Sequence, residues 1–189
     1  QNFSEQFKLL EQKYKYFVKG GALLSGEKKK RYREISEELS KLSLQHNENV
    51  LAETNGFTLH ITDEEEVAGL PEAVREAAAG EARKREKEGW IFTLHHPSYV
   101  PFMQYAHSRK RREELYRAFA SRAFRGNKND NREIVKRMVN LRRERAALLG
   151  YTSHAEMVLE DRMAETPEKV MHFLEELYSA SHPHAEKDF

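Results

Sequence analysis

Apolar side chains recur every three or four residues along most of this chain, a spacing that predicts amphipathic helices. The first stripe ends before a glycine pair at 20–21 and consists of Phe3, Phe7, Leu10, Tyr14 and Phe17. A second stripe, from Tyr32 to Val50, predicts a helix that begins at Ser25 and ends near Leu51. At 1.5 Å per residue this helix is roughly 40 Å long, which is typical of large helical proteins.

Two short segments, 57–61 and 90–94, carry the alternating pattern of a half-buried strand instead. Phe57, Leu59 and Ile61 alternate with two polar residues, and Trp90 begins a similar alternation after Gly89. Two strands alone are only marginally stable in water. We therefore expect these segments to pair as a small antiparallel ribbon that lies against helices.

The other helices are predicted from residues that favour helix starts and ends. Pro71 at a first helical position predicts a helix that continues to about Lys87. Ser98 is expected to cap a short helix, with Pro101 confined to its first turn. The remaining expected starts are Thr62 with Glu65, Ser108, Asp130, Ser153 with Glu156, and Thr166-Pro167, and the expected ends are Gly126 and Gly150.

Together these elements predict a mainly α fold of long packed helices with one small two-stranded antiparallel β-ribbon. Hydrophobic residues make up 39% of the chain and charged residues 33%, so a core can form beneath a strongly charged surface. No apolar run approaches the roughly 18 residues of a membrane span, and no membrane partner is expected. The absence of cysteine excludes disulfide bonds and thiolate chemistry.

The nine histidines contain no recognisable catalytic or metal-binding motif. Zinc peptidases of the HExxH type place two histidines one helical turn apart, and this spacing does not occur here. His46 lies on an apolar stripe and is interpreted as a core or boundary residue. The adjacent His95 and His96 would point to opposite faces of an extended segment, and His182 and His184 flank a proline. We predict no catalytic, cofactor-binding or metal-binding residue in this chain.

Positive charge is concentrated between residues 107 and 145, where fourteen Lys or Arg face five Asp or Glu, a surplus of nine positive charges. The formal net charge of the whole chain is only +1. Such a segment can bind nucleic acid phosphates, or it can cover a helical surface and pair with acidic neighbours. We favour the second interpretation, because no nucleic acid motif accompanies the charge.

Several short motifs recur in the same order in one family of enzymes. They are Phe17-Val18-Lys19-Gly20-Gly21-Ala22-Leu23-Leu24, Glu38-Leu39-Ser40-Lys41-Leu42, Asn49-Val50, Gly69-Leu70-Pro71, Pro97-Ser98-Tyr99-Val100-Pro101-Phe102-Met103, Arg111-Arg112-Glu113, Gly126-Asn127-Lys128-Asn129-Asp130-Asn131, Leu148-Leu149-Gly150-Tyr151 and Met163-Ala164-Glu165-Thr166-Pro167. Through them the chain resembles, over nearly its whole length, the thimet oligopeptidase family of zinc metallopeptidases. Within that family it resembles the bacterial peptidyl-dipeptidases (dipeptidyl carboxypeptidases).

The resemblance implies that residues 1–189 are a single helical segment of a larger, two-lobed enzyme with a deep channel between its lobes. Such enzymes cleave short peptides, and the peptidyl-dipeptidase branch removes C-terminal dipeptides. In the family an HExxH helix and a downstream glutamate hold the zinc, and both follow the region that this chain resembles. The chain begins at Gln1 and ends at Phe189 within a helical pattern, so we expect a piece of a longer protein.

The expected function is that of a non-catalytic portion of a zinc-dependent oligopeptidase, which contributes scaffold and channel wall and is inactive alone. The whole protein would use zinc and short peptide substrates, and its remaining chain would be the partner of this segment. The alternative is a stand-alone helical binding module that binds nucleic acid through residues 107–145. The resemblance leaves both the bacterial cytoplasm and the periplasm open. We expect the segment to fold without zinc, stabilised by the apolar stripes at 32–50, 115–119 and 134–148.

Overall fold

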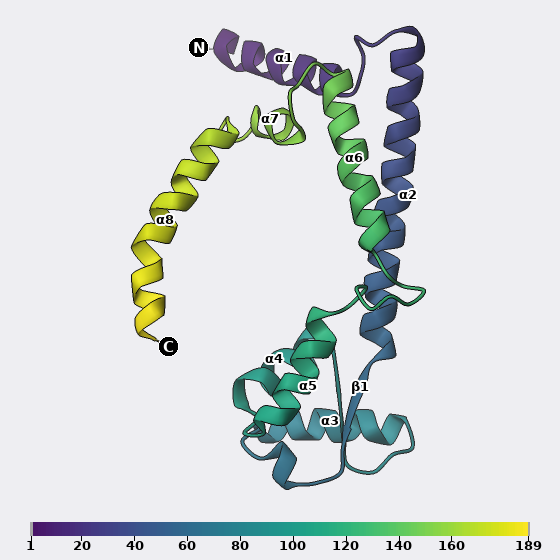
Figure 1. Ribbon diagram of the computed structural model, residues 1–189, viewed down its shortest axis with the longest axis vertical. Helices are drawn as coiled ribbons and strands as arrows, with labels where there is room; N and C mark the ends of the chain where they lie inside the picture. The colour runs from purple at the N-terminus through teal and green to yellow at the C-terminus, as the bar shows by residue number, and fades with distance from the viewer. Residues whose placement is uncertain (1, 189) are drawn as a thin grey trace. The chain divides into compact units, whose positions relative to one another are not determined.

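The structure is a computed structural model that describes residues 2–188, with side chains from Ser4 onward. The chain divides into two compact units (Figure 1). The first unit comprises the chain up to Lys41 and the chain from Lys136 onward, and the second comprises residues 42–135. Helices predominate, and the sheet found in the described residues has two strands. The predicted mainly α fold with one small ribbon is confirmed.

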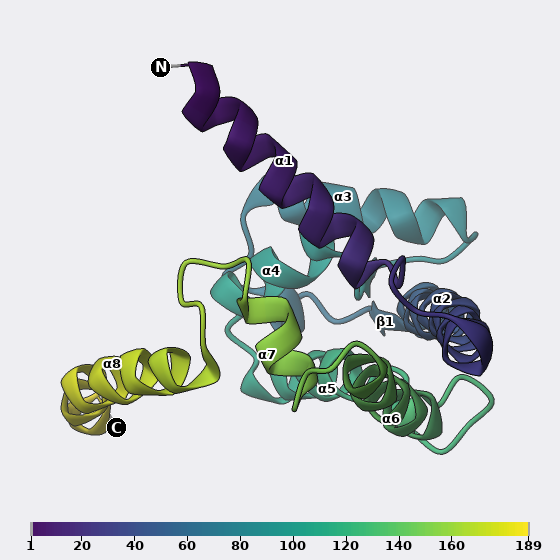
Figure 2. The ribbon, with the colours of Figure 1, turned by 90° about the horizontal axis from the view of Figure 1, so that it is seen from above.

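The first unit is built from helices that lie far apart in the sequence. They are α1 (Asn2–Lys19), the first part of α2 (Gly26–Gly56), the later part of α6 (Arg132–Leu148), α7 (His154–Leu159) and α8 (Pro167–Lys187). In this unit α2 and α6 run side by side (Figure 1, Figure 2). Its core consists of Ile35, Leu39, Leu141, Ala146 and Met157. The predicted stripes on α2 and α6 therefore supply most of its buried side chains.

Two ion pairs connect α2 to α6 within the first unit. The guanidinium of Arg31 donates to both carboxylate oxygens of Glu144 at 2.6 and 2.8 Å. Arg137 donates to both oxygens of Glu38 at 2.6 and 2.8 Å. Paired, fork-shaped contacts of this kind fix geometry better than single surface ion pairs do. They hold the polar flanks of the two helices in register beside the apolar seam.

The turn between α1 and α2 requires the glycine pair. Gly21 has φ +81°, a left-handed conformation that favours glycine, and a Cβ there would lie 3.1 Å from the ring of Tyr32. The hydroxyl of Tyr32 donates to the carbonyl of Lys19 at 2.7 Å. The ammonium of Lys19 contacts Glu160 at 3.0 Å and also Asp161. The predicted end of α1 is confirmed, and it is attached both to α2 and to the chain after α7.

The second unit contains the ribbon and the shorter helices. After the end of α2 come β1 (Thr58–Ile61), the 3₁₀ turn η1 (Glu65–Val67), α3 (Glu72–Lys84), β2 (Trp90–Thr93), α4 (His96–Tyr105) and α5 (Arg109–Ala120). The strands pair antiparallel, with Leu59 opposite Phe92. Gly89 is required before β2, because a Cβ there would lie 2.3 Å from the carbonyl oxygen of Ile61. The predicted ribbon is confirmed.

One apolar face of the ribbon forms the core of the second unit. Phe92 is fully buried and its ring centroid lies 4.5 Å from that of Phe102 on α4. Helices α3, α4 and α5, the 3₁₀ turn η1 and the segments that connect these elements contribute the rest of the cluster. Its buried members are Leu59, Ile61, Val67, Leu70, Ala78, Phe92, Leu94, Phe102, Ala106, Leu115 and Ala118. The ribbon is therefore stabilised by the helices against it, as two strands alone would not be.

Three predicted helix starts have the expected caps. The hydroxyl of Ser108 accepts from the N–H of Arg111, that of Ser153 from Glu156, and that of Thr166 from Lys169. Each hydroxyl satisfies an N–H that has no partner within its helix.

Other predicted boundaries are wrong. Thr62 does not cap η1, because the carboxylate of Asp63 accepts from the N–H of Glu65 instead. Pro71 precedes α3 rather than beginning it, and that helix ends at Lys84 rather than Lys87 because Glu86 has φ +56°. Helix α2 continues beyond the predicted end near Leu51 to Gly56.

The boundaries of α4, α5 and α6 also differ from the sequence-based expectation. Helix α4 begins at His96, so Ser98 lies inside its first turn and Pro101 lies beyond that turn. Helix α5 ends at Ala120, well before Gly126. Helix α6 begins at Arg132 rather than at Asp130, whose carboxylate accepts from the N–H of Gly126 in the preceding turn and from the N–H of Arg132.

Candidate functional site

The histidines considered in the sequence are dispersed over the two units. His46 is half-buried on α2, whereas His95 and His96 are exposed at the start of α4. His182 and His184 lie on α8, where the ring of His182 is 3.6 Å from Glu186. Among residues 2–188 no three His, Cys, Asp or Glu side chains gather closely enough to hold a metal ion. A working zinc site needs about three protein ligands, so the described residues do not fit the metal that the resemblance implies.

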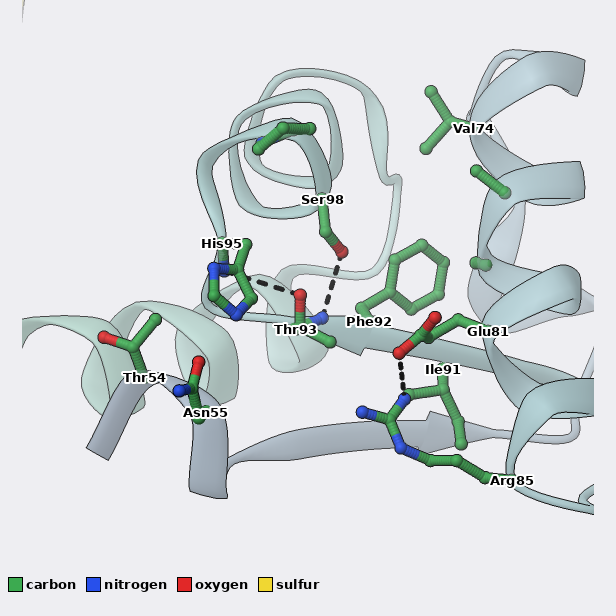
Figure 3. A pocket seen from close by; sticks show the side chains of 13 residues that line it. Thr54, Asn55, Val74, Glu81, Arg85, Ile91, Phe92, Thr93, His95 and Ser98 are labelled. Atoms are coloured by element: carbon green, nitrogen blue, oxygen red, sulfur yellow. Dashed lines mark hydrogen bonds and ion pairs between the residues drawn. The ribbon is translucent and has the colours of Figure 1, made fainter. Parts of the chain in front are cut away.

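The pocket that most resembles a ligand-binding site lies in the second unit, beside the ribbon (Figure 3). Its volume is about 480 Å³, which falls within the range of small-molecule sites. Buried Ile91, Phe92 and Ala78 form apolar walls, and polar side chains come from the end of β2 and from positions in or next to the end of α2, the end of α3 and the start of α4. They are Thr54, Asn55, Glu81, Arg85, Thr93, His95 and Ser98.

The polar groups of this pocket mostly bind one another. The hydroxyl of Ser98 accepts from the N–H of Thr93 at 3.0 Å, and Arg85 donates to Glu81 at 2.5 Å. Figure 3 shows Ser98 directed at Thr93, whereas the ring of His95 is turned toward the end of α2. A serine nucleophile needs a base within hydrogen-bond reach, and these two side chains do not form such a pair. The pocket can hold an apolar group but has no arranged acid–base chemistry.

A structural role for Ser98 gives a first test. Replacing Ser98 by alanine leaves the N–H of Thr93 without its acceptor, so we expect the free energy of unfolding to fall by about 1 kcal/mol. His95→Gln changes the neighbouring polar side chain, and the imidazole it removes makes no such bond, so a change within about 0.5 kcal/mol is expected. Urea unfolding followed by circular dichroism measures both. An unchanged stability in S98A would contradict the structural role.

A polar cluster around the buried side chain of Glu53 joins the end of α2 to the asparagine-rich turn before α6. The carboxylate of Glu53, whose side chain is 7% exposed, accepts from the amides of Asn127 at 2.8 Å and Asn129 at 3.0 Å. The guanidinium of Arg125 lies 3.5 Å from its other oxygen. These amide hydrogen bonds, with Arg125 as a smaller cause, hold the pKa of Glu53 below its usual value. The cluster is a satisfied structural network rather than a reactive site.

Asn131 extends this cluster along α2. Its side-chain amide donates to the carbonyl of His46 at 3.0 Å, and its side-chain oxygen accepts from Asn49 at 2.8 Å. Sequence reasoning identified the 126–131 turn as a family motif but did not identify Glu53 as its partner. Glu53 lies near the end of its helix, more than seventy residues before the run of asparagines. No local sequence pattern connects residues so far apart.

The basic segment 107–145 is not a single free surface. Many of its arginines contact a carboxylate, as the favoured interpretation expected. The pairs are Arg111 with Glu66 and Glu114, Arg117 with Glu113, Arg125 with Glu53, Arg132 with Asp130, and Arg137 with Glu38. The guanidinium of Arg122 lies 3.7 Å from the ring centroid of Phe119. These contacts occupy many of the guanidinium groups that would otherwise bind the phosphates of a nucleic acid.

Two helices of the first unit present apolar faces to solvent. On α1 the side chains of the predicted stripe are 60% to 70% exposed, namely Phe7, Leu10, Tyr14 and Phe17; the side chain of Phe3 lies outside the described part. On α8 no residue is buried, and its exposed members are Met171, Phe173, Leu174, Leu177 and Tyr178. Apolar patches of this kind mark interaction surfaces. None of the described helices is both long and apolar enough to cross a bilayer.

Comparison with known proteins gives a consistent set of relatives. Residues 102–189 match the model of peptidase family M3. Oligopeptidase A of Escherichia coli strain K12 is 40% identical over 187 residues, which are 97% of this chain and 28% of the relative. Organellar oligopeptidase A of Arabidopsis thaliana is 42% identical over 188 residues, 96% of this chain and 24% of the relative.

Dipeptidyl carboxypeptidase of Escherichia coli strain K12 is 31% identical over 183 residues, 96% of this chain and 27% of the relative. The chain thus spans about a quarter of the length of these curated relatives. Nearly all of it is matched, and the match continues through both units. The resemblance deduced from the motifs is confirmed at the level of the family.

Proposed function

Because this chain is related to the peptidases of family M3 along nearly its whole length, we propose that it is a non-catalytic portion of a zinc-dependent peptidase that acts on short peptides. The observation that carries the proposal is an identity of 40% to oligopeptidase A over 97% of the chain. Zinc, peptide substrates and the catalytic centre belong to the whole protein in this proposal. This segment contributes scaffold and channel wall to a larger, two-lobed enzyme.

The distribution of polar chemistry in the segment supports a scaffolding role. Its buried polar groups, such as Glu53 and Asn131, bind other side chains and backbone groups rather than facing a cavity. The pocket beside the ribbon has no arranged nucleophile and base. No HExxH occurs in the sequence, and residues 2–188 contain no cluster that suits a metal ion. Catalysis by the segment alone is therefore not expected.

The exposed apolar faces of α1 and α8 suggest how the segment is held in the enzyme. Helix α8 has 21 residues and no buried side chain, and an isolated helix of this length gains little stability from its own hydrogen bonds. Burial of its apolar side chains against the remaining chain would supply the missing stabilisation. We therefore assign both faces to contacts with the rest of the parent protein.

The cleavage pattern is the finer part of the proposal. Release of C-terminal dipeptides is expected from the resemblance to the peptidyl-dipeptidases. The identity to oligopeptidase A, however, is 40%, against 31% to dipeptidyl carboxypeptidase. Cleavage of short peptides is expected under either relationship. The peptide products formed by the whole protein decide between release of C-terminal dipeptides and internal cleavage.

We expect the whole protein and the isolated segment to differ in whether they depend on a metal ion. The whole protein is expected to cleave short peptides, to lose this activity with a chelator and to regain it with Zn²⁺. The purified segment is expected to cleave none, and its melting temperature should not change with chelator, because its stability comes from apolar packing and polar networks. The measurements are mass spectrometry of peptide products and thermal melts followed by circular dichroism.

Zinc-dependent cleavage by the segment alone, or its unfolding by chelator, would contradict the assignment of the metal site to the rest of the protein. A whole protein that cleaves peptides equally well without metal would contradict the proposed class of enzyme. The alternative function, nucleic acid binding through residues 107–145, predicts affinity for duplex or single-stranded probes that falls steeply with salt. Absence of binding at low salt removes that alternative.

A further inference from the structure

The C-terminal half of α6 carries arginines without carboxylate partners. The guanidinium groups of Arg142, Arg143 and Arg145 have no hydrogen-bond or ion-pair partner among residues 2–188. Earlier in the same helix Arg132 and Arg137 each bind an acidic side chain. A concentration of positive charge near the end of a helix is itself favoured by the helix dipole. It nevertheless leaves several donors available to a negatively charged ligand.

Two of these arginines lie on one face of the helix. Arg142 and Arg145 are three residues apart, so their side chains are neighbours on the helix surface. Arg143 is displaced by about 100° around the axis from Arg142 and by about twice that from Arg145. The face shared by Arg142 and Arg145 is therefore distinct from that of Arg143, although all three occupy little more than one turn.

His154 supplies a third donor beside this face. It is the first residue of α7, which follows α6 after a short turn and lies next to the end of α6 (Figure 1, Figure 2). Its Nδ1 is buried without a hydrogen-bond partner. Its Nε2 also has no protein partner and is not among the buried unpaired atoms of residues 2–188, so it is the nitrogen that a ligand can reach.

Electrostatics connects the imidazole to the same two arginines. Burial is the first cause that holds the pKa of His154 below its usual value, and the positive charges of Arg142 and Arg145 are the second and third. Arg143 is not among the causes. The charges that lower the pKa of His154 are thus those of Arg142 and Arg145, which share one face of α6. A negative ligand at this position would relieve the repulsion and provide acceptors for all three side chains.

We propose that Arg142, Arg145 and His154 form a binding site for an oxyanion, a phosphate or a carboxylate group. The two guanidinium groups and Nε2 of His154 supply the donors to its oxygens. The site lies wholly within the first unit and contains none of the residues that line the pocket beside the ribbon. It does not depend on the assignment of the chain to a peptidase.

The test uses inorganic phosphate and acetate as separate probes at constant ionic strength, with chloride as the balancing anion. Each is titrated into the chain while the imidazole signal of His154 is followed by NMR; loss of that signal in His154→Gln assigns it among nine histidines. We expect saturable shifts with phosphate. A response to phosphate alone identifies a phosphate site, and a response to both identifies a general oxyanion site.

Variants define the donors. Arg142→Gln and Arg145→Gln are each expected to weaken phosphate binding by about tenfold, the change expected for loss of one charge-assisted hydrogen bond. Arg143→Gln removes the same charge from the neighbouring position and is the matched control, with an expected change below about twofold. Arg142 is exposed, so R142Q keeps the test valid if the half-buried Arg145 proves necessary for folding.

Three outcomes would overturn the proposal. They are the absence of a saturable shift of His154 with either probe, unchanged affinity in R142Q, and an equal loss in R143Q, which would indicate general charge attraction.

Discussion

Replacing Phe92 by alanine is expected to lower the free energy of unfolding of the second unit by about 3–5 kcal/mol. The ring of Phe92 is fully buried between the ribbon and the helices and lies 4.5 Å, centroid to centroid, from that of Phe102. The substitution removes buried apolar surface and the aromatic contact with Phe102. It also leaves a cavity that the strand cannot close. Domains of this size are stable by only about 5–15 kcal/mol, so this is a large fraction.

The change is measured by urea unfolding with fluorescence of Trp90, the one tryptophan of the chain, which stands two residues before Phe92 in β2. Phe124→Ala is the matched control, because that ring is 63% exposed and lies 5.1 Å from the guanidinium of Arg132. We expect the control to cost about 1 kcal/mol or less. Equal effects of F92A and F124A would mean that the ribbon is not the centre of the core.

Glu53→Ala is expected to lower the free energy of unfolding by about 2–4 kcal/mol. The substitution removes a buried carboxylate that accepts from the amides of Asn127 and Asn129 and lies beside Arg125. Hydrogen bonds to a charged acceptor contribute more than neutral ones, and this acceptor is buried. Glu48→Ala, an exposed position on the same helix, is the matched control and should change stability by less than about 0.5 kcal/mol.

The contribution of Glu53 also has a predictable pH dependence. Its pKa in the folded protein is lowered from the ordinary value of 4.5, so the unfolded state binds a proton more readily than the folded state. The stabilisation by the charged carboxylate is therefore complete above about pH 4.5 and is lost as the pH falls through the folded-state pKa.

Glu53→Gln resembles the protonated form. Its deficit relative to the natural protein should be largest near neutral pH and should shrink in acid. A deficit that grows in acid would contradict the assigned hydrogen bonds.

Local patterns were sufficient to predict the ribbon and most helices because these elements bury one face. The alternation around Leu59 and Phe92 places both side chains on one side of the ribbon, and spacing along α2 and α6 places Ile35 and Leu141 in a core. Side-chain caps at Ser108, Ser153 and Thr166 were also predictable, because each satisfies an N–H within three residues. Both kinds of signal are contained in short stretches of sequence.

The wrong boundaries have causes that lie elsewhere in the chain. Helix α2 continues past Leu51 because Glu53 and Thr54 bind groups from the 122–129 region, including Arg122 at 2.8 Å from the Thr54 hydroxyl. Ser98 does not begin α4 because its hydroxyl is bound to the strand that precedes the helix. In both cases the boundary depends on a tertiary hydrogen bond that the local sequence pattern does not reveal.

The candidate sites depended on tertiary structure to a greater degree. In the sequence, residues 107–145 formed one basic segment that could either bind nucleic acid or cover a helical surface and pair with acidic neighbours. The structure divides the segment into arginines that bind carboxylates, such as Arg111 and Arg137, and arginines that do not, such as Arg142 and Arg145. The position of His154 beside the second group follows from the turn between α6 and α7, which no spacing rule predicts.

The two units also differ in whether their residues are continuous in the sequence. The second unit is one uninterrupted stretch, whereas the first is assembled from stretches on both sides of it. Chains are synthesised from the N-terminus, so residues 42–135 can fold while the partners of Arg31 and Glu38, which are Glu144 and Arg137, have not yet left the ribosome. Until then the start of α2 displays its apolar stripe, including Ile35 and Leu39, without its partner on α6. The start of α2, rather than the ribbon, is therefore the part of this chain on which a chaperone would act during synthesis.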